Sequence, residues 1–158
     1  MSLKKNKIEF ILKGKRHCIN INEESLSPTT TVLEYLRSKP EFKGVKEGCA
    51  EGDCGACTLV LGSLTKDGTI KYKSFDSCLV FLPMLHGKEL ITVECIGSSD
   101  KLHHVQKEMV ECDGSQCGYC TPGFIMSMYY LYQKGKPATR EEIDDALTGN
   151  LCRCTGYR

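Results

Sequence analysis

The stretch "GCAEGDCGAC", Gly48–Cys57, places three cysteines on one glycine-rich loop, and a fourth, Cys78, follows after 20 intervening residues. This C-x4-C-x2-C spacing with a distant fourth cysteine is the plant-type pattern of a [2Fe–2S] iron–sulfur site. Gly48, Gly52 and Gly55 allow backbone angles that would strain other residues, so the loop can wrap closely around a cluster. We therefore predict four metal-binding thiolates, here called the first set: Cys49, Cys54, Cys57 and Cys78.

More cysteines lie near the end of the sequence. "QCGYCTPG", Gln116–Gly123, carries a C-x2-C pair, and "NLCRCTG", Asn150–Gly156, carries a C-x-C pair after 31 intervening residues. If Pro122 opens a helix, unpaired N–H groups and the positive end of the helix dipole would face an anionic cluster here. We predict four further metal-binding thiolates, here called the second set: Cys117, Cys120, Cys152 and Cys154.

The spacing of the cysteines leaves two other interpretations open. The first set could be the structural tetrad of a zinc ribbon, although such sites usually present two CxxC-like pairs. Cys117 and Cys120 could be a thioredoxin-like dithiol, but this leaves Cys152 and Cys154 unexplained and lacks the expected βαβ context. A free cysteine is commonly a small buried hydrophobe, so three cysteines are given no chemistry: Cys18, Cys95 and Cys112.

The composition argues against several partners. The 158 residues carry 21 basic and 20 acidic side chains spread along the chain, so we expect no binding to nucleic acid or to an anionic membrane. No apolar run reaches the length of a membrane span, and the start "MSLKKNKIEF" has no apolar signal core. We therefore expect a cytoplasmic protein. In that reducing compartment, eleven cysteines indicate metal binding rather than disulfides.

The first half of the chain shows the alternation typical of β-strands. We predict a hairpin over residues 7–21 around "KGK", a second from "CTLVLGSL" and "IKYKSF" around "TKDG", and a last strand in "KELITVE". The second hairpin would account for the long connection between Cys57 and Cys78. Between the hairpins, "PTTTVLEYLRS" carries a capping box, Thr31 with Glu34, and predicts a short helix.

The second half shows helical periodicity. "KLHHVQKEMVEC" predicts one helix, with His103 and His104 facing solvent or a partner. "TPGFIMSMYYLYQKG" predicts another, with Thr121 as its N-cap. In "TREEIDDALTG", the capping box of Thr139 and Glu142 predicts a third helix. The predicted fold class is α+β, with one domain over residues 1–94 and another over residues 95–158.

Three long motifs in the same order carry a family resemblance. "EGCAEGDCGACT", "QCGYCTPGFIMS" and "GNLCRCTGYR" resemble the two-cluster iron–sulfur subunit of the xanthine dehydrogenase family of molybdenum hydroxylases. This family includes xanthine, nicotinate, aldehyde and carbon monoxide dehydrogenases, and the resemblance covers almost the whole chain. It implies an N-terminal β-grasp, plant-type ferredoxin-like domain followed by a C-terminal helical-bundle [2Fe–2S] domain.

The resemblance also implies a function. The chain would be the electron-transfer subunit of an oxidoreductase, relaying electrons from a molybdenum site to flavin through two [2Fe–2S] clusters. A large partner subunit would bind molybdopterin and a medium one FAD. The sequence has no GxGxxG fingerprint and no phosphate loop, so no substrate site is expected in this chain. In the family, the glutamine before the helical domain's first cysteine and the last cysteine of C-x-C contact the pterin, which implies these roles for Gln116 and Cys154.

The substrate of the whole enzyme is expected to be an N-heterocycle such as nicotinate or a purine. The alternatives are the small subunit of an aldehyde or carbon monoxide dehydrogenase, a free-standing ferredoxin-like carrier, and a structural zinc protein. Zinc and iron–sulfur proteins differ in colour, since sulfide-to-iron charge transfer makes the latter brown. A free carrier would differ from a subunit in native size.

Overall fold

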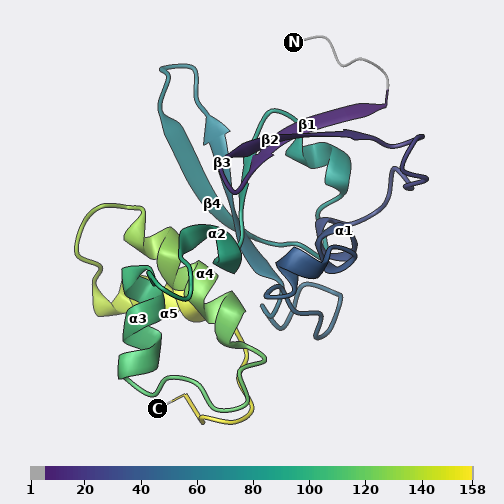
Figure 1. Cartoon of the computed structure of the whole chain (residues 1–158). Helices are drawn as coiled ribbons and strands as arrows, with labels where there is room; N and C mark the ends of the chain where they lie inside the picture. The colour runs from purple at the N-terminus through teal and green to yellow at the C-terminus, as the bar shows by residue number, and fades with distance from the viewer. Residues whose placement is uncertain (1–5, 158) are drawn as a thin grey trace.

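A five-stranded sheet carries the fold, and the helices of the second half pack beside it (Figure 1). The computed structural model describes residues 6–157. The strand order is β2-β1-β5-β3-β4. β1 and β5 run parallel, while the other neighbouring strands are antiparallel. The predicted α+β class is confirmed. The strands are β1 Lys7–Leu12, β2 Lys15–Asn20, β3 Thr58–Leu64, β4 Ile70–Asp76 and β5 Glu89–Ile91.

The first hairpin, β1 with β2, lies where the sequence predicted it. Leu12 pairs with Lys15, so the turn contains only Lys13 and Gly14. Both turn residues have positive φ, 52° and 69°. Two positive φ angles in succession are typical of the turns that match the twist of a two-residue hairpin. The predicted three-residue turn "KGK" is therefore wrong by one residue, because Lys15 already belongs to β2.

Helix α1, Val32–Arg37, begins at the predicted capping box. The Glu34 N–H donates to Thr31 Oγ1 at 3.1 Å, and the Thr31 N–H donates to the Glu34 carboxylate at 2.7 Å. These two bonds satisfy N–H groups that have no partner within the helix. The apolar face of α1 belongs to the main hydrophobic core, through Val32, Leu33, Tyr35 and Leu36.

The second hairpin accounts for the long connection between Cys57 and Cys78, as predicted. β3 and β4 pair along their full lengths, so the chain leaves and returns at the same end of the sheet. The last strand, β5, is shorter than "KELITVE" suggested. It ends at Ile91, because the following residues form the short helix α2, Val93–Ile96.

Three longer helices make up the rest of the second half: α3 His104–Glu111, α4 Thr121–Tyr132 and α5 Arg140–Leu147. The capping box predicted for α5 is present. The predicted N-cap of α4 is wrong by one residue. Cys120 is the N-cap, and the Thr121 hydroxyl instead lies 2.7 Å from that of Ser115.

Helix α3 corrects the expectation for one of the two histidines. His103 is the N-cap of α3, and its Nδ1 accepts a hydrogen bond from the Val105 N–H at 3.3 Å. Its ring centroid lies 5.2 Å from that of Tyr129 and 5.0 Å from that of Tyr132. His103 therefore joins α3 to α4 rather than facing solvent. His104 is exposed, as expected.

Helix α4 connects the helical part of the molecule to the sheet. Met126 is fully buried in the core that the sheet and α1 form, and Tyr129 and Tyr130 pack against the same core. The two halves of the chain therefore share packed apolar surface. Within residues 6–157, no helix is both long and apolar enough to span a bilayer.

Candidate iron–sulfur sites

The first set of cysteines forms two pairs at the end of the sheet where β3 begins and β4 ends. Cys57 Sγ lies 3.4 Å from Cys78 Sγ, because the β3–β4 hairpin brings the two residues together. Cys49 and Cys54 form the other pair. The Cys49 N–H donates to Cys54 Sγ at 3.4 Å, and the two side chains interact. The structure thus brings the predicted members together pairwise.

Backbone N–H groups point at the sulfur of Cys49. The donors are Glu51 and Asp53, with N–Sγ distances of 3.5 and 3.3 Å. Positive φ angles at Ala50 and Gly52, 59° and 86°, turn the loop so that these groups face inward. The N–H groups, that of Glu51 first, lower the pKa of Cys49 to about 7. A loop of inward N–H groups stabilises a thiolate and any anion beside it.

Cys57 has a different environment. Burial raises the pKa of its thiol to about 12. Asp76 Oδ1 lies 3.8 Å from Cys57 Sγ, and burial raises the pKa of this carboxyl as well. A buried pair of thiolates is unfavourable unless a cation compensates the charge. The buried pair of Cys57 and Cys78 is therefore suited to bind metal.

The second set also forms two pairs. The Cys117 side chain interacts with that of Cys154, and the Cys120 side chain interacts with that of Cys152. A backbone hydrogen bond from Tyr119 is the main cause that lowers the pKa of Cys117. Burial raises the pKa of Cys120 to about 11. Each pair therefore joins one thiol that ionises more easily than usual to one that ionises less easily.

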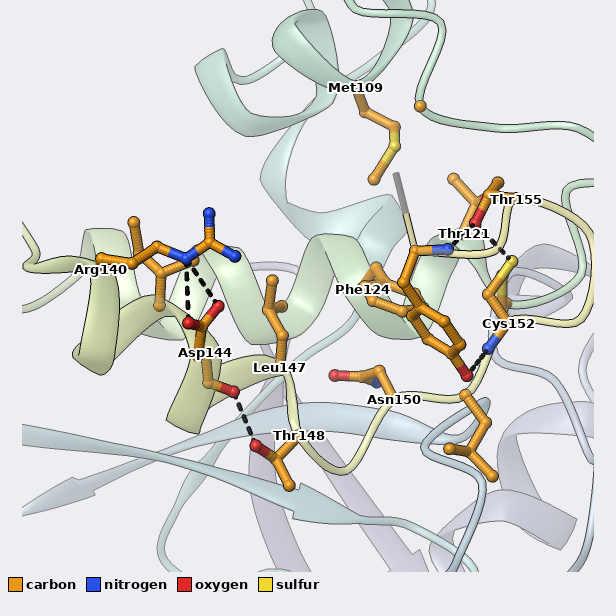
Figure 2. Close-up of a pocket in the computed structure, with 15 residues that line it drawn as sticks. Met109, Thr121, Phe124, Arg140, Asp144, Leu147, Thr148, Asn150, Cys152 and Thr155 are labelled. Atoms are coloured by element: carbon orange, nitrogen blue, oxygen red, sulfur yellow. Dashed lines mark hydrogen bonds and ion pairs between the residues drawn. The ribbon is translucent and has the colours of Figure 1, made fainter.

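Cys152 is held by two side chains that follow it in the sequence (Figure 2). Thr155 Oγ1 donates a hydrogen bond to Cys152 Sγ at 3.2 Å. The Cys152 N–H donates to the Tyr157 hydroxyl at 2.8 Å. The Thr155 hydroxyl is the main cause that lowers the pKa of Cys152 to about 7. The role of Thr155 could not be predicted from the sequence, because a threonine in a loop carries no signal of this kind.

The pairing of the cysteines bears on whether each set would bind a zinc ion or a [2Fe–2S] cluster. A structural zinc ion requires four ligands around one point. Within residues 6–157, no three His, Cys, Asp or Glu side chains converge on one such point. A [2Fe–2S] cluster has two irons that share four cysteines, which suits thiols arranged as two neighbouring pairs. Both sets of cysteines therefore fit a [2Fe–2S] cluster.

The two sets are joined through Asn150, which is only 4% exposed. Its Nδ2 donates to the Gly55 carbonyl at 3.1 Å and to Thr58 Oγ1 at 3.3 Å, and its Oδ1 accepts from Ser127 Oγ at 2.6 Å. The next residue, Leu151, donates its N–H to the carbonyl of Cys54 at 3.0 Å. One short segment before Cys152 is thus bonded directly to the loop of the first set. The role of Asn150, like that of Thr155, has no signal in the sequence.

A cavity of about 190 Å³ lies at the second set, because all four cysteines of that set line it, and Cys54 of the first set borders it as well. Its walls come from the first loop, from the turn before α4 and from the C-x-C segment. The lining residues are Gly48, Cys54, Ala56, Cys117, Tyr119, Cys120, Leu151, Cys152, Arg153 and Cys154. The Tyr119 hydroxyl donates to the carbonyl of Glu47 and so connects the turn before α4 to the first loop.

The outer side of the second set is exposed. Gln116, Cys117, Arg153 and Cys154 are all exposed, whereas Cys120 and Cys152 are half-buried. The two residues with a predicted pterin contact, Gln116 and Cys154, are therefore both accessible at the surface. Whether they touch a pterin stays a prediction. Of the three remaining cysteines, Cys18 and Cys112 are exposed rather than buried and Cys95 is half-buried.

A larger cavity of about 530 Å³ lies among α3, α4 and α5 (Figure 2). Met109, Phe124 and Leu147 give it an apolar interior. The Arg140–Asp144 ion pair, at 2.9 Å, lies at one rim, and Cys152 lies at the other. This cavity therefore borders the second set at Cys120 and Cys152.

Comparison with known proteins identifies relatives of this arrangement. Residues 92–158 match the family described as "[2Fe-2S] binding domain". The chain is 44% identical over 154 residues to a xanthine dehydrogenase/oxidase of Rattus norvegicus, and 41% identical over 153 residues to an aldehyde oxidase of Homo sapiens. These alignments cover 97% and 94% of this chain. The chain spans only 11% of the length of each relative.

Two solved structures are also similar. The aldehyde oxidoreductase from Desulfovibrio desulfuricans superimposes with a TM-score of 0.80 at 32% identity, over 96% of this chain and 16% of that one. The quinoline 2-oxidoreductase from Pseudomonas putida superimposes with a TM-score of 0.77 at 29% identity, over 96% of this chain and 85% of that one. The resemblance inferred from the three motifs is confirmed. This chain is homologous to the iron–sulfur region of xanthine dehydrogenases and aldehyde oxidases, which are oxidoreductases of the molybdenum hydroxylase type.

Proposed function

We propose that this chain carries electrons, one at a time, between a molybdenum site and a flavin that partner subunits hold. The observation that carries this proposal is the arrangement of eight cysteines as two sets of paired thiols, joined by the segment from Asn150 to Cys152. A [2Fe–2S] cluster bound at each set would supply one-electron redox chemistry. The proposed ligands are Cys49, Cys54, Cys57 and Cys78 for one cluster, and Cys117, Cys120, Cys152 and Cys154 for the other.

The protein's part in this function is to hold the thiolates and to offset their charge. N–H groups of Glu51 and Asp53 face Cys49, and the Thr155 hydroxyl faces Cys152. Donors of this kind stabilise negative charge, which increases by one unit when a cluster takes up an electron. The hydrogen bonds of Asn150 keep the loops of the two sets in contact, so the distance for electron transfer stays short.

The two sets differ in exposure, which supports a direction for the relay. The second set is exposed at Cys117 and Cys154, beside Gln116. We propose that this side meets a large subunit with molybdopterin, and that the Gln116 amide and Cys154 contact the pterin. The first set would then face a medium subunit with FAD. We also propose that the chain has two domains, a β-grasp, ferredoxin-like domain over residues 1–94 and a helical-bundle domain over residues 95–158.

For the whole enzyme we propose an N-heterocyclic substrate such as nicotinate or a purine, and a place in the cytoplasm. Relatives named for xanthine and for quinoline favour a heterocycle. Relatives named for aldehydes favour the alternative, an aldehyde-oxidising enzyme. Identification of the large chain that copurifies with this one would decide between them.

Metal analysis with electron paramagnetic resonance tests the proposal. The purified chain should contain about four iron atoms and give two distinct [2Fe–2S] signals after reduction. Cys49→Ser and Cys117→Ser should each remove one signal, while Cys18→Ala, at an exposed cysteine outside both sets, should leave both. Zinc in place of iron, or two signals retained in Cys117→Ser, would contradict the ligand assignment. A native mass equal to that of the chain alone would favour a free carrier.

A further inference from the structure

Thr155 lies beside the second set but is not one of its proposed ligands, so cluster binding by the four cysteines does not explain its contact with Cys152. Its hydroxyl donates a hydrogen bond to Cys152 Sγ at 3.2 Å, as the dashed line in Figure 2 shows. Among residues 6–157, no other hydroxyl is hydrogen-bonded to the sulfur of any of the eight cysteines of the two sets; the hydroxyls of Ser77 and Tyr157 bond only to backbone groups of Cys57 and Cys152. The sulfur of Cys49, by comparison, accepts hydrogen bonds from the backbone N–H groups of Glu51 and Asp53.

The position of Thr155 is fixed on both sides of its hydroxyl. Thr155 Oγ1 accepts a hydrogen bond from the Tyr157 N–H at 3.3 Å while it donates to sulfur. The Tyr157 hydroxyl in turn accepts from the Cys152 N–H at 2.8 Å. These three bonds form a closed turn around Cys152, so the hydroxyl proton of Thr155 is directed at the sulfur. Thr155 is also half-buried, which limits competition from water.

We propose that Thr155 is a positioning residue that raises the reduction potential of the cluster bound by the second set. The inference rests on the proposed function, since it requires a [2Fe–2S] cluster at Cys152. Reduction adds an electron and makes the cluster and its thiolates more negative. A hydrogen bond to a ligand sulfur becomes stronger as the sulfur gains negative charge, so it stabilises the reduced form more than the oxidised form. The hydroxyl therefore favours electron uptake.

The test is a redox titration of the full chain with its clusters, followed by electron paramagnetic resonance. Thr155→Val keeps the shape of the side chain and removes the hydroxyl. We expect the midpoint potential of the second-set cluster to become more negative, while that of the first-set cluster is unchanged. Thr155→Ser keeps a hydroxyl and should return the potential towards the wild-type value. The Cys117→Ser variant identifies which signal belongs to the second set.

Thr148→Val is a matched control. Thr148 lines the same large cavity, but its hydroxyl donates to the Asp144 carbonyl at 2.7 Å and not to sulfur. The midpoint potential of the second-set cluster in Thr148→Val should equal that of the wild type. Equal potentials in wild type and Thr155→Val would overturn the proposal, as would an equal shift in Thr148→Val. Loss of the cluster in Thr155→Val with retention in Thr155→Ser would also overturn it, because the hydroxyl would then serve assembly instead of potential. Absence of any second-set signal in the wild type would refute the proposed function itself.

Discussion

Replacement of Asn150 by alanine tests whether one buried amide holds the two sets of cysteines together. The change removes three side-chain hydrogen bonds, to Gly55, Thr58 and Ser127. The Gly55 carbonyl and the Thr58 hydroxyl keep each other as partners at 2.8 Å, so only the buried Ser127 hydroxyl loses its partner in this network. At roughly 0.5–1.5 kcal/mol for each hydrogen bond, we expect the free energy of unfolding to fall by about 3 kcal/mol.

The assay is denaturant unfolding of the chain, combined with electron paramagnetic resonance of the reduced clusters. Besides the loss of stability, Asn150→Ala should weaken the magnetic interaction between the clusters, because their loops are no longer bonded through Asn150. Ser127→Ala removes only one of the three bonds and should cost about 1 kcal/mol. Asn22→Ala, at an exposed turn residue, should change stability by less than about 0.5 kcal/mol. A loss below about 1 kcal/mol for Asn150→Ala, with an unchanged magnetic interaction, would refute this reasoning.

Three further predictions concern single positions. Gly123→Ala should destabilise the chain and lower iron content, because the new Cβ would lie 2.1 Å from the Gly55 carbonyl oxygen, and unfolding with iron analysis would measure both. Asp76→Asn removes a carboxylate 3.8 Å from Cys57 Sγ and should raise the potential of the first-set cluster in a redox titration, whereas a lower potential would contradict this. Burial lowers the pKa of His103 below its unfolded value, so the unfolded state binds the proton more readily and stability should decrease as pH falls from about 7 to about 5. This decrease in stability should be absent in His103→Asn, because asparagine keeps an N-cap acceptor but does not titrate in this pH range. Denaturant unfolding of both proteins as a function of pH would measure the difference.

The sequence predicted the elements that depend on local signals. The capping boxes at Thr31 and Thr139 start helices where they were expected, because both partners of each box lie within four residues of each other. The hairpins followed from alternation and turn residues in the same way. The errors are also local. The turn at Lys13 and Gly14 is one residue shorter than predicted, since alternation alone does not fix the register of a hairpin.

Contacts between distant residues could not be predicted from the sequence. Cys152 is identified as a ligand candidate by its spacing, but the Thr155 hydroxyl at its sulfur depends on how the turn folds. The sequence predicts an outward-facing His103, yet the rings of Tyr129 and Tyr132 in α4 pack against it. Asn150 contacts residues 95 and 92 positions away in the sequence, Gly55 and Thr58. Such pairs are created only when the helical part packs on the sheet.

The glycines near the cysteines have a second role that their motifs alone do not reveal. Gly55 has a φ of 65°, which suits a tight loop, but a Cβ there would also lie 2.4 Å from the carbonyl oxygen of Gly149. A Cβ at Gly123, in the first turn of α4, would lie 2.1 Å from the carbonyl oxygen of Gly55. Backbone therefore contacts backbone where the two sets meet, and a larger residue at either position would move the loops apart. Because electron transfer requires short distances, we interpret these glycines as residues that bring the two sets close together, in addition to shaping each loop.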